Sequence, residues 1–339
     1  MSVPPSTFQV ARFQLTYRFQ TDGPMPKQKG GVLRGGFGTA FQQTSCPQTC
    51  WQRADACTSQ PPCNFRRIFQ AERPAGSPVL QGMDDAPRPF VIELSSDQRS
   101  WYQMDDTLSF ALILIGSGIA ELPHFLHSFD RLGQLGLGPQ RTPARLERVT
   151  AVHPWREPPL LVYDAGVLQQ TTVGVPVVDG AEIARRAAQL PAHLWLAIRT
   201  PLRLKQHGTI QRGFSLVALV RALTLRLTAL TAFYHPDEPV PRIDHRALLA
   251  QAAAVQLRHA NIRWVDWERT STNQPADRTM NLGGIIGAVE LHHVAPELRA
   301  LLLAGSLVHV GKACVFGHGA IRIEELRPPR TPAGITGQA

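Results

Sequence analysis

A lysine and a histidine lie among three glycines near the end of the chain, in residues 311–323, GKACVFGHGAIRI. Lys312 carries a positive charge that suits an anionic oxygen, and His318 has an imidazole that can exchange a proton near neutral pH. The three glycines are Gly311, Gly317 and Gly319. Glycine lets another group approach the main chain closely, and successive N–H groups in such a loop can hold an anion. The segment is therefore either an anion-binding loop or a tight hairpin whose glycines only satisfy turn geometry.

The charge of the chain points to a polyanionic partner. Lysine and arginine number 35 against 26 acidic residues, for a formal net charge of +9. Three stretches contain no Asp or Glu: residues 23–54, 183–236 and 298–323. Opposite charges are usually interspersed on a plain solvated surface, so three acid-free stretches favour a nucleic-acid-binding face. An apolar fraction of 43% excludes a disordered chain.

Hydrophobic periodicity predicts the same order of elements twice along the chain. In the first half, we expect strands and helices in this order: strand 8–19, helix 33–43, strands 88–94 and 106–116, helix 122–136, strand 144–153. In the second half, the order is strand 193–204, helices 215–234 and 244–258, strands 261–271 and 281–293, helix 296–306, and a terminal pair of strands within 307–326. This βαββαβ order predicts the α+β class, with two tandem ferredoxin-like (RRM-like) domains.

The composition of the connecting segments predicts the domain boundaries. An N-terminal domain with a cysteine-bearing insertion occupies residues 1–153, and a C-terminal domain with the glycine-rich loop occupies 191–327. Proline and glycine spacing predicts a linker over 154–190, and 328–339 predicts a flexible tail. The N-terminus has no basic flank before an apolar core, and the longest apolar run, 108–120, is too short to span a bilayer. We therefore expect a cytoplasmic protein with no membrane partner.

Six segments occur in an order that resembles a known family. They are 33–46 (LRGGFGTAFQQTSC), 122–141 (LPHFLHSFDRLGQLGLGPQR), 200–208 (TPLRLKQHG), 265–274 (VDWERTSTNQ), 280–291 (MNLGGIIGAVEL) and 309–319 (HVGKACVFGHG). Together they resemble the CRISPR-associated RAMP-superfamily endoribonucleases that process precursor CRISPR RNA. The resemblance covers the chain from its first predicted helix to its last predicted strand.

The resemblance implies an enzyme that binds the CRISPR repeat RNA and cuts it without a metal or cofactor. The ribose 2′-hydroxyl beside the scissile phosphate attacks, which requires a proton acceptor, a proton donor and cations near the phosphate. The product stays bound as the mature guide RNA, and other subunits of a CRISPR effector complex are further expected partners. The alternative is a non-catalytic RNA-binding subunit of such a complex, with the same fold and no cleavage.

The chain departs from the family at the residues expected to move protons. Thr39 stands in the first predicted helix where family members often carry a histidine, and threonine cannot shuttle a proton near neutral pH. The family often shows Leu and Lys where this chain has His318 and Ala320. The candidate catalytic residues are therefore His318, His309 and Lys312. Each histidine is either an acid–base group or a structural residue, a loop residue for His318 and a buried strand residue for His309.

Basic and glycine residues in the family segments are the candidate RNA contacts. The resemblance implies that the glycine-rich loop approaches the RNA backbone with Lys312 as an added charge. The set of candidates comprises Arg34, Arg203, Lys205, His207, Arg269, Arg278, Gly311, Gly317 and Gly319. Any one of the cations could instead form a surface ion pair of small energetic consequence.

Four of the five cysteines fall in one insertion, at positions 46, 50, 57 and 63. Clustered cysteines in a cytoplasmic protein favour a metal site over disulfides. The paired CxxC spacing of common zinc sites is missing, so the alternatives are a structural zinc held by Cys46, Cys50, Cys57 and Cys63, or reduced thiols that pack a loop. Cys314, in the glycine-rich segment, is expected to be a small core residue.

Overall fold

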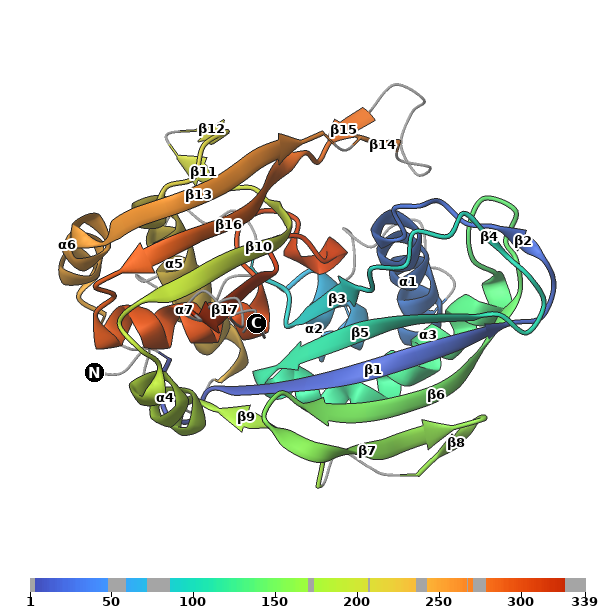
Figure 1. Cartoon of the computed structure of the whole chain (residues 1–339). Helices are drawn as coiled ribbons and strands as arrows, with labels where there is room; N and C mark the ends of the chain where they lie inside the picture. The colour runs from blue at the N-terminus through green and yellow to red at the C-terminus, as the bar shows by residue number, and fades with distance from the viewer. Residues whose placement is uncertain are drawn as a thin grey trace, which may run out of the picture.

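The protein, described from a computed structural model, consists of two αβ domains that lie side by side (Figure 1). In each domain the helices pack on one face of an antiparallel sheet. The structure describes residues 4–47, 59–71, 86–169, 174–206, 208–235, 243–266, 268–270 and 279–326, the side chains of 268–270 and 279–281 excepted.

The N-terminal sheet is built around β1, whose side chains alternate between the two faces. Phe13, Leu15 and Tyr17 are fully buried on the helix side, because a strand directs every second residue to the same face. The strands in spatial order are β3 (Phe90–Leu94), β5 (Thr107–Ile115), β1 (Gln9–Phe19), β6 (Ala144–His153), β7 (Arg156–Asp164) and β8 (Val167–Leu168). β9 (Val178–Asp179) pairs with the start of β1.

An aromatic cluster holds the helices against this sheet. The three helices are α1 (Gly30–Ser45), α2 (Asn64–Phe69) and α3 (Leu122–Leu135). Phe37 of α1 is fully buried, and its ring contacts five other rings: Phe41, Phe69, Phe90, Phe125 and Phe129. Buried aromatic side chains each remove a large apolar area from water, so this cluster fixes where α1 lies.

The C-terminal domain repeats the plan. Its sheet has the order β13 (Gln256–Val265), β16 (Gly284–His292), β10 (Leu194–Leu202) and β17 (Ile321–Glu325). The helices are α4 (Gly180–Gln189), α5 (Leu216–Tyr234), α6 (His245–Ala254) and α7 (Pro296–Val308). The four core strands of both sheets stand in the same spatial order: second, third, first, fourth. The predicted tandem ferredoxin-like fold is therefore confirmed.

Three short ladders lie outside the two sheets. They are β2 (Gly23–Pro24) with β4 (Trp101–Tyr102), β11 (Lys205–Gln206) with β12 (Thr209–Ile210), and β14 (Glu268–Thr270) with β15 (Thr279–Asn281).

The domains share a buried apolar cluster. Val91 and Ile113 of the N-terminal sheet belong to the same cluster as Leu202 and Val310 of the C-terminal domain. Helix α5 is long and apolar enough to cross a membrane, but 61% of its most apolar stretch is buried inside the protein. Its apolar surface therefore serves this core.

Two predictions about local structure were wrong. Residues 154–190, predicted as a linker, contain β7 on the edge of the N-terminal sheet and α4, which packs on α7. The prolines of β7 hide its strand pattern. An edge strand tolerates proline because fewer of its backbone N–H groups are needed for pairing. Residues 307–326 contain one strand, β17, because five residues of the glycine-rich loop have positive φ: His309, Gly311, Ala313, Gly317 and Gly319. Residues with positive φ recur too often here for a regular strand to form.

Candidate nucleic-acid interface

The glycine-rich loop, residues 309–320, is packed tightly between the two domains. A Cβ at Gly317 would lie 2.7 Å from the carbonyl oxygen of Ile92 in the other domain. A Cβ at Gly319 would lie 1.8 Å from the carbonyl oxygen of Val310. Both glycines have positive φ, 82° and 71°, so backbone conformation and close packing together require them.

Hydrogen bonds hold the loop at both ends. The N–H groups of Gly319 and Lys312 donate to the carbonyl oxygens of Pro201 and Arg203, at 3.1 and 3.0 Å. The Thr200 hydroxyl donates to the carbonyl of Gly317 at 2.8 Å and accepts from a loop N–H. The N–H of Gly317 donates to Cys314 within the loop. The expectation that Gly317 and Gly319 offer free N–H groups to phosphate is therefore corrected, because both N–H groups are already used within the chain.

The two histidines of the loop are buried. His309 is fully inaccessible and His318 is 2% exposed. Burial, and then the charges of Arg203 and His309, lower the pKa of His318 to about 3. A group with that pKa is poorly matched to proton transfer at neutral pH, and neither ring is exposed to RNA. The structure therefore favours structural roles for His309 and His318 over the catalytic roles predicted for them.

Three predicted RNA contacts come together beside the loop. Lys312 and Lys205 are exposed, and Arg203 is half-buried with its guanidinium donating to the carbonyl of Gly283 at 2.7 Å. The N–H of Lys312 donates to the carbonyl of Arg203, so the loop lies against the strand end that carries these two cations. Exposed cations on and next to the loop suit the phosphates of a nucleic acid. Gly311 lies against the same carbonyl group: a Cβ added at Gly311 would be 2.5 Å from the carbonyl oxygen of Arg203.

Arg34 joins α1 to the loop. Its guanidinium lies over the ring of Phe69 at 4.6 Å, and over Phe90 and Phe316 at 5.7 and 5.8 Å. Phe316 belongs to the glycine-rich loop, so this stacking connects the first helix to it. His207, Arg278 and the side chain of Arg269 lie outside the described residues.

A cleft of about 1040 Å³ opens on another side of the loop and is lined by both domains. Its cations are Arg12, Lys27, Lys29, Arg199 and Arg322. All but Arg12 lie in the acid-free stretches that predicted a nucleic-acid-binding face, although none was a candidate RNA contact. Arg12 lies between two buried residues of β1, so strand alternation was the signal that could have found it.

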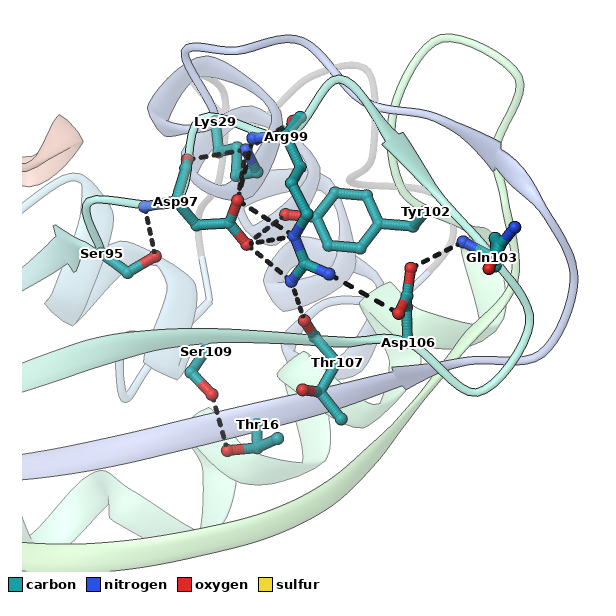
Figure 2. Close-up of polar contacts among 10 residues, drawn as sticks. All are labelled: Thr16, Lys29, Ser95, Asp97, Arg99, Tyr102, Gln103, Asp106, Thr107 and Ser109. Atoms are coloured by element: carbon teal, nitrogen blue, oxygen red, sulfur yellow. Dashed lines mark hydrogen bonds and ion pairs between the residues drawn. The ribbon is translucent and has the colours of Figure 1, made fainter.

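A polar network stiffens one rim of the cleft (Figure 2). The Lys29 ammonium is 4% exposed and donates to the carbonyls of Asp97 and Arg99 at 2.8 and 2.9 Å. Burial lowers its pKa. The Asp97 carboxylate accepts from Arg99 and from the Tyr102 hydroxyl at 2.7 Å. Burial opposes the charge of Asp97, but these hydrogen bonds outweigh it and lower its pKa. The pKa of Tyr102 is raised, first by burial and then by the carboxylate of Asp97. The Tyr102 hydroxyl therefore keeps its proton and acts as a hydrogen-bond donor, not as a base.

Two of the predicted metal ligands lie next to each other. The Cys46 sulfur, at the end of α1, is 3.6 Å from the Cys63 sulfur at the start of α2. Cys50 and Cys57 lie outside the described residues. Within the described part of the chain, no group of three or more potential ligands is placed to hold a metal. Cys314 is 5% exposed, as expected of a core residue.

Two family models match consecutive parts of the chain. Residues 8–174 match a model described as an N-terminal domain, and residues 196–321 match that of the CRISPR-associated endoribonuclease Cas6. No curated protein sequence matches the chain.

Solved structures share the whole fold at low sequence identity. A partial Cas6-RT-Cas1–Cas2 complex has a TM-score of 0.55 at 14% identity, over 97% of this chain. The chain spans 48% of that longer protein. A Cas6 product complex has a TM-score of 0.53 at 14% identity, and Cas6 from Thermus thermophilus has 0.53 at 13%. Both cover 94% of this chain and all of the other.

The tandem ferredoxin-like domains are the fold that this chain shares with the Cas6 structures. Residues 196–321, which include the glycine-rich loop, are similar to the CRISPR-associated endoribonuclease Cas6.

Proposed function

We propose that this chain binds CRISPR repeat RNA and cleaves it by metal-independent attack of a ribose 2′-hydroxyl. The observation that carries the proposal is the Cas6 match over the domain that holds the glycine-rich loop. The exposed cations beside that loop, Lys312 and Lys205, support it because cleavage concentrates negative charge on the phosphate oxygens.

In this reaction the O2′–phosphorus bond forms as the phosphorus–O5′ bond breaks. The products are a 2′,3′-cyclic phosphate and a 5′-hydroxyl, and the proton lost from O2′ is balanced by one gained at O5′. Lys312, on a loop that is hydrogen-bonded at both ends, is the cation we assign to the scissile phosphate. A rigid support keeps such a charge in place without reorganisation during the reaction.

The alternative function is that of a non-catalytic RNA-binding subunit of a CRISPR complex. It is favoured by Thr39 on the exposed side of α1 and by the burial of both loop histidines. In this function the same cations hold the RNA and no bond is cut.

The two functions are separated by incubating the purified chain with its cognate repeat RNA in EDTA. A matched RNA carries a 2′-deoxy substitution at the cut site. Under the proposal, the first RNA is cut and the second is bound but not cut. Tight binding of both RNAs without cleavage supports the alternative, and cleavage of the deoxy RNA contradicts 2′-hydroxyl attack.

We also propose that Cys46, Cys50, Cys57 and Cys63 bind a structural zinc ion; of these four, the structure describes Cys46 and Cys63. Two thiolates on a tetrahedral zinc with bonds of about 2.3 Å lie about 3.8 Å apart, close to the observed 3.6 Å. The metal would hold α2 against α1 and take no part in cleavage. Its expected setting is the cytoplasm, where thiols stay reduced.

Removing either thiol should therefore release the zinc. Elemental analysis of the purified protein is expected to find about one zinc per chain, and almost none in Cys46→Ser and Cys63→Ser. Cys314→Ser is the control, because this buried thiol lies on the glycine-rich loop, and it should keep the metal. A wild-type chain purified without zinc, and unable to take it up, would contradict the site.

A further inference from the structure

His309 occupies a backbone conformation that side chains rarely adopt. Its φ is 59° and its ψ is 169°, in a region used almost only by glycine. Such strain persists only where the surroundings fix the residue strongly. Here both ring nitrogens have partners: Nδ1 lies 3.0 Å from the carbonyl oxygen of His318, and Nε2 lies 3.3 Å from a carboxylate oxygen of Glu93.

Glu93 belongs to the other domain. Glu93 lies on β3. Arg12, on β1 of the same sheet, donates a hydrogen bond to each carboxylate oxygen of Glu93, and one of these bonds is 2.9 Å long. Burial opposes the charge of Glu93, but the hydrogen bonds from His309 and Arg12 outweigh it and lower its pKa to about 2. The carboxylate is therefore ionised at neutral pH.

The two partners of His309 are both oxygen acceptors. The ring is therefore held from both sides, by the glycine-rich loop and by the N-terminal sheet. Arg203 also lies near this contact, because its charge helps to lower the pKa of His318. The arrangement is a chain of three groups, in which the carboxylate of Glu93 lies between the guanidinium of Arg12 and the ring of His309.

We propose that Glu93 and His309 form a hydrogen-bonded latch between the two domains, and that Glu93 is a positioning residue for RNA cleavage. Glu93 fixes the ring of His309, His309 fixes the carbonyl of His318, and the loop between them carries Lys312. The inference rests on the proposed cleavage for its effect on rate. The latch itself is a structural statement that can be tested without cleavage.

The test replaces Glu93 by Gln, which keeps the shape of the side chain and removes its charge. Glu147→Gln is the matched control: Glu147 accepts from Arg18 at 2.7 and 3.1 Å in the same sheet, and its contacts do not involve the loop. The rate of a single turnover and the Kd for an uncleavable 2′-deoxy repeat RNA are measured for each variant. We expect E93Q to lower the rate tenfold or more and to change the Kd less than threefold, and E147Q to change neither.

Hydrogen exchange reports the latch separately from the chemistry. The N–H groups of Val310, Lys312 and Gly319 are hydrogen-bonded in the loop, so they should exchange faster in E93Q and in His309→Gln than in the wild type or E147Q. Unchanged exchange in both variants overturns the latch. Faster exchange with an unchanged rate overturns the positioning role. A wild-type protein that cuts no RNA contradicts the proposed function and leaves the exchange result to decide the latch.

Discussion

Alanine in place of Gly319 is expected to lower the free energy of unfolding by about 3 kcal/mol and to detach the glycine-rich loop from its site. The reason is twofold. The φ of Gly319 is 71°, and a Cβ there would lie 1.8 Å from the carbonyl oxygen of Val310, with the carbonyl carbon at 2.8 Å. Backbone cannot move aside as a side chain can, so the loop must shift and carry Lys312 with it. Denaturant unfolding and RNA cleavage measure the two effects.

Gly166 provides the matched control for this substitution. It also has a positive φ, 98°, but a Cβ built there meets nothing within 4 Å. Gly166→Ala should therefore show only the conformational cost, about 1 kcal/mol, and full RNA cleavage. Equal losses of stability in the two variants would mean that φ alone matters at Gly319 and that the loop is not held by close packing.

The fold could be predicted from the sequence because the hydrophobic patterns of its strands and helices are visible within short stretches of the chain. The alternation of Phe13, Leu15 and Tyr17 is set by the strand period and by one buried face, and both are visible in a few consecutive residues. The same holds for the aromatic residues of α1 and α3, which recur at helical spacing. Two βαββαβ units have few ways to pack their apolar faces, and the strand order observed in both sheets is that of the predicted ferredoxin-like fold.

The roles of the loop histidines could not be predicted, because they depend on residues far away in the chain. His309 contacts Glu93, 216 positions earlier, and this contact exists only after the domains have packed. A histidine beside glycines and a lysine indicates catalysis when read locally. Once the domain interface buries it, the same residue has both nitrogens committed to hydrogen bonds and becomes part of the scaffold.

The sequence predicts that lysine and arginine gather at the site, but it does not predict which of them are exposed. Lys312 and Lys205 are exposed as the sequence suggests, whereas Lys29 is 4% exposed and bonded to two carbonyl groups. Lys27 lies two residues before Lys29, lines the same cleft and is exposed, so two lysines of one basic stretch differ in availability. Only the position of residues 97–99 in space, against the start of α1, separates them.

Histidine in place of Thr39 is expected to speed RNA cleavage by about 100-fold or more. Thr39 is exposed on α1, two residues after Phe37, whose aromatic contacts fix the helix. Arg34 on the same helix lies over the ring of Phe316, so α1 contacts the glycine-rich loop that carries Lys312. A positioned general acid or base contributes about 10²–10⁴ in rate, and the described loop histidines are buried away from this task. Single-turnover cleavage of the repeat RNA measures the gain.

Thr39→Asn is the control for this gain, because asparagine matches much of the shape and polarity of histidine but cannot exchange a proton near neutral pH. T39N should cleave at the wild-type rate, and T39H should gain a dependence on pH that T39N and the wild type do not have. Binding of the uncleavable 2′-deoxy RNA should be the same for all three, since Thr39 is uncharged and the phosphate contacts are made elsewhere. If T39H cuts no faster than T39N, proton transfer does not limit the reaction at this position, and the surface of α1 beside the loop is not where the scissile phosphate lies.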